Sequence, residues 1–344
     1  MIEIFDPPFV SIIIPTLNAA LTVEASIEAV LNQTYPKERM EIIVIDGGSI
    51  DDTVKILSEF PLLILLQTQD YPGDSGARNI GALYAQGEII VTTDADDTVD
   101  PNWLINLIRQ YTEPYIGSVV GSSRTVYDKS NWQERLISLF LICVRGSDRV
   151  EDIYNKKGML KTNIGVGPNQ SFRKSVFKEI GGYDMGLTSG MDLDIVWRVE
   201  KAGYKCVFAP NSIVYKKSRK NFRDFIRQTY DRSKGGTSIY LKHPSKITPI
   251  YICNMLFIDL VGLLVLMNID QTSKILAYSL LMVLLVPLGF TGIKLMRTRK
   301  YITGWIDRFL LFLVVYIVTI VSSVAFHIGV YNYIFKYKES LITP

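Results

Sequence analysis

Glu88-Ile-Ile-Val-Thr-Thr-Asp-Ala-Asp-Asp97 is an apolar run that ends in three carboxylates. Its apolar and β-branched residues predict a buried strand over residues 88–93. Side chains alternate along a strand, so Asp94 and Asp96 would point the same way if the strand continued through them. Convergent carboxylates repel unless a cation lies between them, and the hard ions Mg²⁺ and Mn²⁺ prefer oxygen ligands. The pattern predicts a metal site, with a solvated acidic turn before Pro101 as the alternative.

The same kind of apolar run occurs three times before this stretch. We expect strands at residues 10–14, 41–45 and 62–67, and helices at 18–32, 53–60 and 76–86. This alternation predicts an α/β fold with a doubly wound, mostly parallel sheet. Ligands of such sheets bind beyond the carboxyl ends of the strands, where Pro15, Thr16, Asp46 and Asp94 all fall. Their shared placement favours one site built from several loops.

No glycine-rich fingerprint of a dinucleotide-binding or P-loop protein follows the first expected strand. A nucleotide would therefore be held by carboxylates and backbone groups. Asp46 could accept a hydrogen bond from a base imide or a ribose hydroxyl. Arg78, close to a predicted helix start, could meet a phosphate with help from the helix dipole. A surface ion pair is the alternative for Arg78.

A further acidic position, Asp192, lies in the loop-to-helix stretch Gly190-Met-Asp-Leu-Asp-Ile-Val-Trp-Arg198. Asp is a preferred N-cap residue, so helix capping is the plain interpretation of this position. The alternative is a catalytic base, because a carboxylate beside a binding edge could accept a proton.

The composition of the chain limits the classes of protein to which it can belong. The chain has 344 residues, 48% of them hydrophobic, and its net charge of +3 gives no case for nucleic-acid binding. The three cysteines, Cys143, Cys206 and Cys253, are scattered and form neither a disulfide framework nor a paired metal motif. The N-terminus has no basic n-region and no apolar core segment. We therefore expect the first domain to stay in the cytoplasm.

Apolar residues gather in the last third of the chain. We expect an α-helical transmembrane region with helices at residues 250–267, 275–293 and 309–335, each long enough to span a bilayer. The loop before the third helix is basic, which places it on the cytoplasmic side. We therefore divide the chain into a cytoplasmic domain at 1–215, a basic juxtamembrane segment at 216–248 and a transmembrane region at 249–344.

Residues 216–234 hold eight basic and two acidic residues. Within them Phe222, Phe225, Ile226 and Tyr230 fall on one face of a helix. A basic amphipathic helix just before a span is typical of a segment on an anionic inner leaflet, and a solvated helix is the alternative. To this membrane face we assign Arg219, Lys220, Arg223, Arg227 and Arg232. Residues 132–145 are either a second interfacial helix or an ordinary core helix.

Five blocks of the chain, taken together, resemble the inverting family 2 glycosyltransferases, which have the GT-A fold. The blocks are Val10-Ser-Ile-Ile-Ile-Pro-Thr-Leu-Asn18, Ile43-Val-Ile-Asp-Gly-Gly-Ser-Ile-Asp-Asp-Thr53, Gly76-Ala-Arg-Asn79, Asp94-Ala-Asp96 and Gly190-Met-Asp-Leu-Asp-Ile-Val-Trp-Arg198. They appear in the family's order. The resemblance implies a nucleotide-sugar donor linked to UDP or GDP. By position, Pro15, Thr16 and Asp46 would line the pocket for its base and ribose, with Arg78 close by.

The resemblance also implies catalytic and metal roles. Asp94 and Asp96 match the D-x-D element, where Mg²⁺ or Mn²⁺ bridges the donor's two phosphates. Asp192 matches the residue that acts as general base. Two positions depart from the pattern: Gly47 stands where a second acid is usual, and Met191 stands where a Glu is usual. The change at Met191 bears on the choice of acceptor.

The spans and the basic segment favour an integral membrane enzyme that acts on a lipid-linked acceptor at the cytoplasmic face. Similar enzymes are the polyprenyl- and dolichyl-phosphate sugar synthases and the transferases that extend a lipid-linked sugar or glycan, and the sequence does not separate the two. A processive polysaccharide synthase is an alternative, although its Gln-x-x-Arg-Trp motif is absent from Gln228-Thr-Tyr-Asp-Arg232. Another is a catalytically silent membrane scaffold that binds nucleotide sugar. Lone spans would also suit a homo-oligomer.

Overall fold

The structure is a computed structural model that describes residues 6–66, 73–128, 130–145, 169–243 and 305–342. The chain divides into two compact units. The first comprises Met1–Val126 and Gly146–Lys217, and the second comprises Tyr127–Arg145 and Ser218–Pro344. Each unit has an apolar core of its own.

The first unit is built on an eight-stranded sheet with the order β3-β2-β1-β4-β7-β6-β8-β5. Its strands are β1 (Val10–Thr16), β2 (Met40–Asp46), β3 (Leu63–Leu66), β4 (Ile89–Thr92), β5 (Asp97–Val99), β6 (Ile116–Val126), β7 (Gln170–Arg173) and β8 (Lys205–Lys217). The four strands from β3 to β4 in this order are parallel. β7 runs antiparallel to both of its neighbours, and β5 runs antiparallel to β8. The predicted α/β class is confirmed, with a parallel half and a mixed half.

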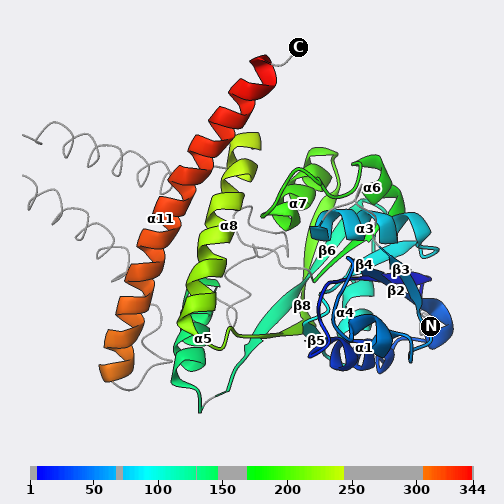
Figure 1. Cartoon of the computed structure of the whole chain (residues 1–344). Helices are drawn as coiled ribbons and strands as arrows, with labels where there is room; N and C mark the ends of the chain where they lie inside the picture. Colours follow the sequence, from blue (N-terminus) through cyan, green and yellow to red (C-terminus); the bar gives the residue numbers. More distant parts are fainter. Residues whose placement is uncertain (1–5, 67–72, 129, 146–168, 244–304, 343–344) are drawn as a thin grey trace, which may run out of the picture. The chain divides into compact units, whose positions relative to one another are not determined.

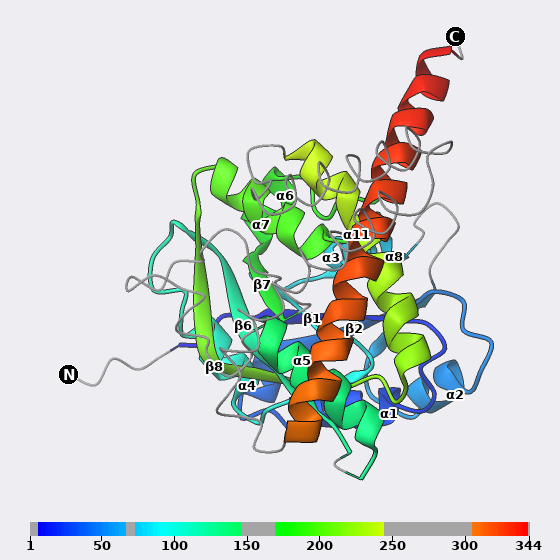
Figure 2. The ribbon, with the colours of Figure 1, turned by 90° about the vertical axis from the view of Figure 1, so that its left-hand side faces the viewer.

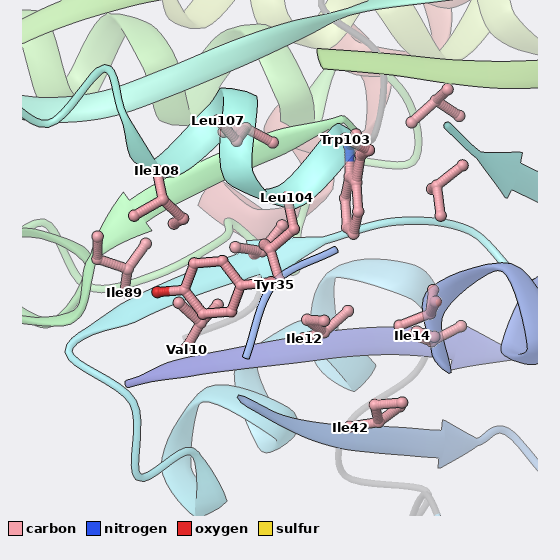
Figure 3. Close-up of a cluster of buried hydrophobic side chains, with 14 of the residues drawn as sticks. Val10, Ile12, Ile14, Tyr35, Ile42, Ile89, Trp103, Leu104, Leu107 and Ile108 are labelled. Carbon is pink, nitrogen blue, oxygen red and sulfur yellow. The ribbon is translucent and has the colours of Figure 1, made fainter. Parts of the chain in front are cut away.

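One face of this sheet is covered by α1 (Val23–Leu31), α2 (Thr53–Leu57) and α4 (Trp103–Ile108), and a 3-10 turn at Lys37–Arg39 leads into β2. Figure 3 shows Ile12 and Ile14 of β1 in a cluster with Trp103 and Leu104 of α4, all fully buried. β-branched residues suit a parallel sheet that is covered on both faces. Full burial of each such side chain contributes about 1.5–3 kcal/mol.

The opposite face carries α3 (Gly73–Tyr84), α6 (Lys174–Glu179) and α7 (Met191–Lys201) (Figure 1). Ile13 points to this side, as alternation along β1 requires. Gly81 lets α3 come close to β1, because a Cβ at this position would lie 2.5 Å from Cγ2 of Ile13. Arg78 lies one turn earlier on the same helix, so this tight contact also fixes the position of Arg78.

Two helices begin at residues other than those predicted. α1 starts at Val23 rather than near Asn18, because the loop between β1 and α1 is tied to the loop after β2. The Asn18 N–H donates to Oγ of Ser49 (2.8 Å), and the Ile50 N–H donates to Oδ1 of Asn18 (2.9 Å). α3 starts at Gly73, three residues before the predicted start.

The second unit packs α5 (Trp132–Arg145), α8 (Phe222–Lys242) and α11 (Trp305–Ile342) around one core (Figures 1 and 2). The rings of Phe140 and Phe225 meet edge to face, with centroids 5.4 Å apart. Of the two interpretations of residues 132–145, the structure supports the core helix. Phe222, Phe225 and Ile226 of α8 also pack in this core. Packing inside the protein therefore explains the amphipathic pattern of α8, and that pattern no longer points to a bilayer.

Among the residues that the structure describes, one segment, Phe309–Val330 of α11, is long and apolar enough to cross a membrane, with a mean hydropathy of 2.7. It lies within the third predicted span, 309–335. A single such helix is weak support for a span, because a buried core helix has the same properties. The predicted spans at 250–267 and 275–293 lie outside the described residues.

Candidate active site

Three carboxylates converge at the turn between β4 and β5. Oxygen atoms of Asp94, Asp96 and Asp97 lie within 4.8 Å of one another. β4 ends at Thr92, so the strand does not continue through Asp96 as our prediction required. The Asp97 N–H donates to the Asp94 carbonyl (3.2 Å) and closes the turn. The carboxylates converge because the chain turns, and not because they share one face of a strand.

Two cations lie against these carboxylates. Nη2 of Arg78 is 2.7 Å from Oδ1 of Asp94, and Nζ of Lys216 is 3.3 Å from Oδ2 of the same residue. Lys216 also pairs with Oδ2 of Asp97 at 2.8 Å. Burial by itself would raise the pKa of Asp94, but Lys216 and Arg78 together hold that pKa below its ordinary value. Asp94 therefore stays ionised.

Asp97 is the most deeply buried of the three carboxylates, with 2% of its side chain exposed. Burial raises its pKa to about 7, in spite of Lys216 and with a further contribution from the charge of Asp94. The pKa of Lys216 is raised, because Asp94 and Asp97 outweigh the effect of its own burial.

Arg78 is buried, with 3% of its side chain exposed, so the alternative of a surface ion pair is wrong. Its guanidinium carbon lies 5.5 Å from the centroid of the Tyr183 ring, a cation–π distance. Because α3 begins at Gly73, Arg78 lies beyond the first turn, and the expected help from the helix dipole does not apply. Its charge instead faces Asp94.

Asp192 is the second residue of α7. The N-cap is Gly190, in a left-handed conformation with φ 80, so helix capping by Asp192 is wrong. Its Oδ1 is buried and has no hydrogen-bond partner within the described part of the chain. Burial raises the pKa of Asp192 to about 6. The positive charge of Arg78 acts to lower this pKa, and the negative charge of Asp94 acts to raise it. A carboxylate that titrates near neutrality is suited to accept a proton.

A buried frame of hydrogen bonds holds Asp192 and Tyr183. Nε2 of Gln170, on β7, donates to the backbone carbonyl of Asp192 (2.9 Å). The hydroxyl of Tyr183 donates to Oε1 of Gln170 (3.0 Å). The side chain of Asn79 makes two 2.8 Å hydrogen bonds to the backbone of Tyr183. This frame links β7, α3 and α7 at the site.

The positions predicted for the nucleotide lie at the carboxyl edge of the parallel strands. Thr16, which follows Pro15, pairs with Asp46 across β1 and β2. Asp46 is buried, and its Oδ2 accepts hydrogen bonds from the N–H groups of Gly48 and Ser49, both at 2.9 Å. Asp46 thus holds the loop after β2. The buried Thr16 hydroxyl has no partner among the described residues, which leaves a polar atom for a ligand.

The predicted acceptor and membrane residues fall in different units. Met191 is the first residue of α7, next to Asp192, and it is partly buried. The basic residues assigned to a membrane face belong to the second unit and are exposed. They are Arg219 and Lys220, before α8, and Arg223, Arg227 and Arg232, on α8.

The model of the family described as "Glycosyl transferase family 2" matches residues 11–181, from β1 to just beyond α6. The match includes the acidic turn after β4 and the loop after β2. The chain carries a family 2 glycosyltransferase domain. The predicted resemblance and the predicted enzyme class are thereby confirmed.

Named relatives of this glycosyltransferase share about a quarter of their residues with it. Glycosyltransferase AglE of Haloferax volcanii is 27% identical over 238 residues, which cover 68% of this chain and 75% of AglE. The probable glycosyltransferase YdaM of Bacillus subtilis is 27% identical, and the match covers 68% of this chain but 57% of YdaM. A Methanococcus voltae protein is 26% identical over 66% of this chain and 73% of its own length. It is named dolichyl N-acetyl-α-D-glucosaminyl phosphate 3-β-D-2,3-diacetamido-2,3-dideoxy-β-D-glucuronosyltransferase.

Solved structures confirm the GT-A type of fold. The mannosyltransferase PcManGT of Pyrobaculum calidifontis, in complex with GDP-Man and Mn²⁺, superposes with a TM-score of 0.56 at 18% identity. That match covers 93% of this chain and 87% of PcManGT. GalNAc-T7, with UDP, GalNAc and Mn²⁺, gives a TM-score of 0.50 at 18% identity and covers 68% of this chain and 51% of that one. At these identities the likeness concerns the fold.

The acidic turn of the glycosyltransferase domain fits a hard divalent ion. Asp94, Asp96 and Asp97 offer carboxylate oxygens, the ligands that Mg²⁺ and Mn²⁺ prefer, within 4.8 Å of one another. The donor set is therefore consistent with the predicted metal. Arg78 and Lys216 already face oxygens of Asp94 and Asp97, so an incoming ion would meet these two protein cations there.

The sequence did not assign a role to four residues of this site. In the sequence Asp97 is only the neighbour of the D-x-D element, and Lys216 is one of the basic residues of the segment 216–234. The pairing of β5 with β8 sets Lys216 opposite Asp97, and no local pattern predicts this pairing. Gln170 lies on β7, 22 residues before Asp192 and 13 before Tyr183, and no local pattern predicts the bonds that join these residues in the folded chain.

Proposed function

We propose that the chain transfers a sugar, with inversion, from a nucleoside diphosphate sugar to an acceptor, using Asp192 as the base. The observation that carries this proposal is the buried Oδ1 of Asp192, which has no hydrogen-bond partner among the described residues and whose carboxyl has a pKa of about 6. It belongs to the same charge network as Arg78 and Asp94. A base with a pKa near the working pH gives efficient proton transfer.

The chemistry balances as a single displacement. An acceptor oxygen forms a bond to the anomeric carbon while the bond from that carbon to the diphosphate breaks. The acceptor proton passes to Asp192, and the bonding pair leaves on the diphosphate. Attack on the opposite face inverts the anomeric centre. If the acceptor is a lipid phosphate it is already ionised, and Asp192 would then orient it.

The donor would lie along the carboxyl edge of the parallel strands. Thr16 offers there a hydroxyl that bonds to none of the described residues, and Asp46 shapes the loop that would close over the base and ribose. A Mg²⁺ or Mn²⁺ ion held by Asp94 and Asp96 would neutralise charge on the leaving diphosphate. Arg78 supplies fixed positive charge beside them.

The acceptor that we propose is lipid-linked, either a polyprenyl phosphate or a lipid-linked sugar or glycan at the cytoplasmic membrane face. The name of the Methanococcus voltae relative specifies an acceptor on dolichyl phosphate. The apolar segment Phe309–Val330 and the exposed basic residues around the start of α8 are consistent with a membrane protein. The three-part division at residues 215 and 248 belongs to the same proposal.

Transfer assays in detergent or native membranes test the proposal. Radiolabelled UDP- and GDP-sugars are offered with Mn²⁺ or Mg²⁺ to polyprenyl phosphate and, separately, to a native lipid extract. Asp192→Asn should abolish transfer, whereas Glu59→Gln, an exposed carboxylate on the same unit, should keep it. Transfer to polyprenyl phosphate identifies a lipid-phosphate glycosyl synthase, and transfer to the extract alone identifies an enzyme that extends a lipid-linked glycan. Donor binding without transfer to any acceptor would replace the enzyme with the scaffold alternative.

The membrane face has its own test. Joint replacement of Arg219, Lys220, Arg223 and Arg227 by Gln should weaken binding to anionic liposomes, because each basic residue near such a surface contributes about 1 kcal/mol. Neutral liposomes serve as the control. Unchanged binding to the anionic liposomes would remove these residues from the proposal.

A processive synthase is the second candidate. Poly-β-1,6-N-acetyl-D-glucosamine synthase of Staphylococcus epidermidis is 24% identical over 68% of this chain, but the match covers 56% of that relative. The products of the assay separate the two candidates by length, because a processive enzyme releases long chains and the proposed transferase adds one sugar.

A further inference from the structure

Lys216 lies between two members of the acidic turn. Its Nζ is 2.8 Å from Oδ2 of Asp97 and 3.3 Å from Oδ2 of Asp94. The lysine stands at the end of β8, directly opposite Asp97 in the antiparallel register with β5. The position of this charge is therefore set by strand pairing as well as by side-chain attraction.

We propose that Lys216 is a resident cation of the acidic turn and competes with a divalent metal ion for Asp94 and Asp97. A metal ion that takes Oδ2 of Asp94 needs the oxygen that Lys216 now contacts. The ammonium also repels any cation that enters the same space. This inference rests on the proposed function, which gives the acidic turn its metal.

The competition has a structural reason. Three carboxylates at this spacing would repel one another, and the two protein cations hold them together in the absence of a metal. Arg78 is buried and bound on the far oxygen of Asp94, Oδ1, so it can stay when a metal arrives. Lys216 has 23% of its side chain exposed and a long flexible stem, so it is the cation that can leave.

The test measures Mn²⁺ binding to the full chain in detergent without a donor, by electron paramagnetic resonance of free Mn²⁺, at about pH 8, where ordinary carboxylates are ionised. Lys216→Met should bind Mn²⁺ about tenfold or more tightly than the native chain, because a unit charge beside the site is removed. Lys216→Arg keeps the charge and should stay within about twofold of the native affinity. Lys217→Met is the matched control, because Lys217 is exposed and its side chain points to the other face of β8. The Mn²⁺ affinity of this variant should equal that of the native chain.

An equal or lower affinity of Lys216→Met, including no binding by either protein, would overturn the inference. The same increase of Mn²⁺ affinity in Lys217→Met would also overturn the inference. Such an increase would show that the net charge of the protein matters, and not the position of Lys216 between the carboxylates. Circular dichroism of each variant confirms that it is folded. Because the measurement needs no transfer, a failure of the proposed function would appear separately in the transfer assay, as an absence of product from the native chain or as transfer that Asp192→Asn leaves unchanged.

Discussion

Gln170 holds the backbone of Asp192 through a 2.9 Å hydrogen bond from its Nε2 to the Asp192 carbonyl. Its other amide atom accepts from the hydroxyl of Tyr183, whose ring lies against the guanidinium of Arg78. One buried side chain thus connects the proposed base to the group that pairs with Asp94. The proposed base is positioned by the sheet and not by its own helix alone.

Replacement of Gln170 by Leu should lower kcat more than it changes KM for the donor. The side chain of Asp192 would lose its backbone support, and small displacements of a catalytic group cost about tenfold to a hundredfold in rate. Steady-state kinetics over donor concentration provide the measurement. Gln33→Leu is the matched control, because Gln33 is also buried and bonds to backbone, at Asp100 and Leu104, away from the site. Equal losses of kcat in both variants would show that Gln170 acts through stability only.

The pH dependence of transfer should report Asp192. Its pKa is raised to about 6, so the ionised base is lost as the pH falls through that value. We expect kcat/KM to fall about tenfold per pH unit below this pKa and to be level above it. A profile that stays level down to pH 4 or so would exclude Asp192 as the titrating base, given the ordinary range of carboxyl pKa values.

Asp192→Asn should also stabilise the protein at alkaline pH. The pKa of the carboxyl is about 6 in the folded chain, against an ordinary value of 3.8, so the folded state is increasingly disfavoured as the pH rises from 3.8 and the penalty is complete above about pH 6. The variant should gain about 1–3 kcal/mol at pH 8 and less than about 1 kcal/mol at pH 4, where the folded carboxyl is protonated and the unfolded one is only partly ionised. Denaturant unfolding at the two pH values provides the measurement. A gain of equal size at both values would point to a cause other than this ionisation.

Arg78→Met should destabilise the first unit by about 3 kcal/mol, because removal of one partner leaves Asp94 charged and half-buried. Arg39→Met removes the same charge from an exposed pair with Asp6 and should cost less than about 1 kcal/mol. The double variant Arg78→Met with Asp94→Asn should recover part of the loss. Urea unfolding of the native chain, Arg78→Met, Asp94→Asn and the double variant completes the cycle. Similar losses of unfolding free energy in Arg78→Met and Arg39→Met would mean that burial does not strengthen the pair of Arg78 and Asp94.

Gly81→Ala should destabilise the fold by about 1–3 kcal/mol, because its Cβ would lie 2.5 Å from Ile13 on β1. Gly236→Ala offers the comparison within α8, since a Cβ there meets no atom of the described residues within 4 Å. That change should be neutral or stabilise by up to about 1 kcal/mol, as Ala favours a helix over Gly. Thermal unfolding separates the two variants, and a neutral Gly81→Ala would mean that α3 can move away from the sheet.

The sequence by itself determined the order of the elements and the edge at which the site lies. Runs such as residues 10–14 and 41–45 are apolar on both faces, and this pattern specifies buried parallel strands without knowledge of their partners. The carboxyl ends of parallel strands share one edge of a sheet, so Thr16, Asp46 and Asp94 could be placed together before any contact was known. This information is local, because each apolar run and the turn residues that end it lie within a few consecutive positions of the sequence.

The tertiary structure decided which charges meet there. Lys216 reaches the acidic turn because β8 pairs with β5, and Asp97 faces it across that pair. Within the described part of the chain the Oδ1 of Asp192 has no partner, and the raised pKa of that carboxyl follows from burial, which is a property of the packed chain. The apolar face of α8 found its partner in α5 and α11 rather than in lipid. Such contacts join residues far apart in the sequence, and their energies depend on distance and desolvation, which no local pattern encodes.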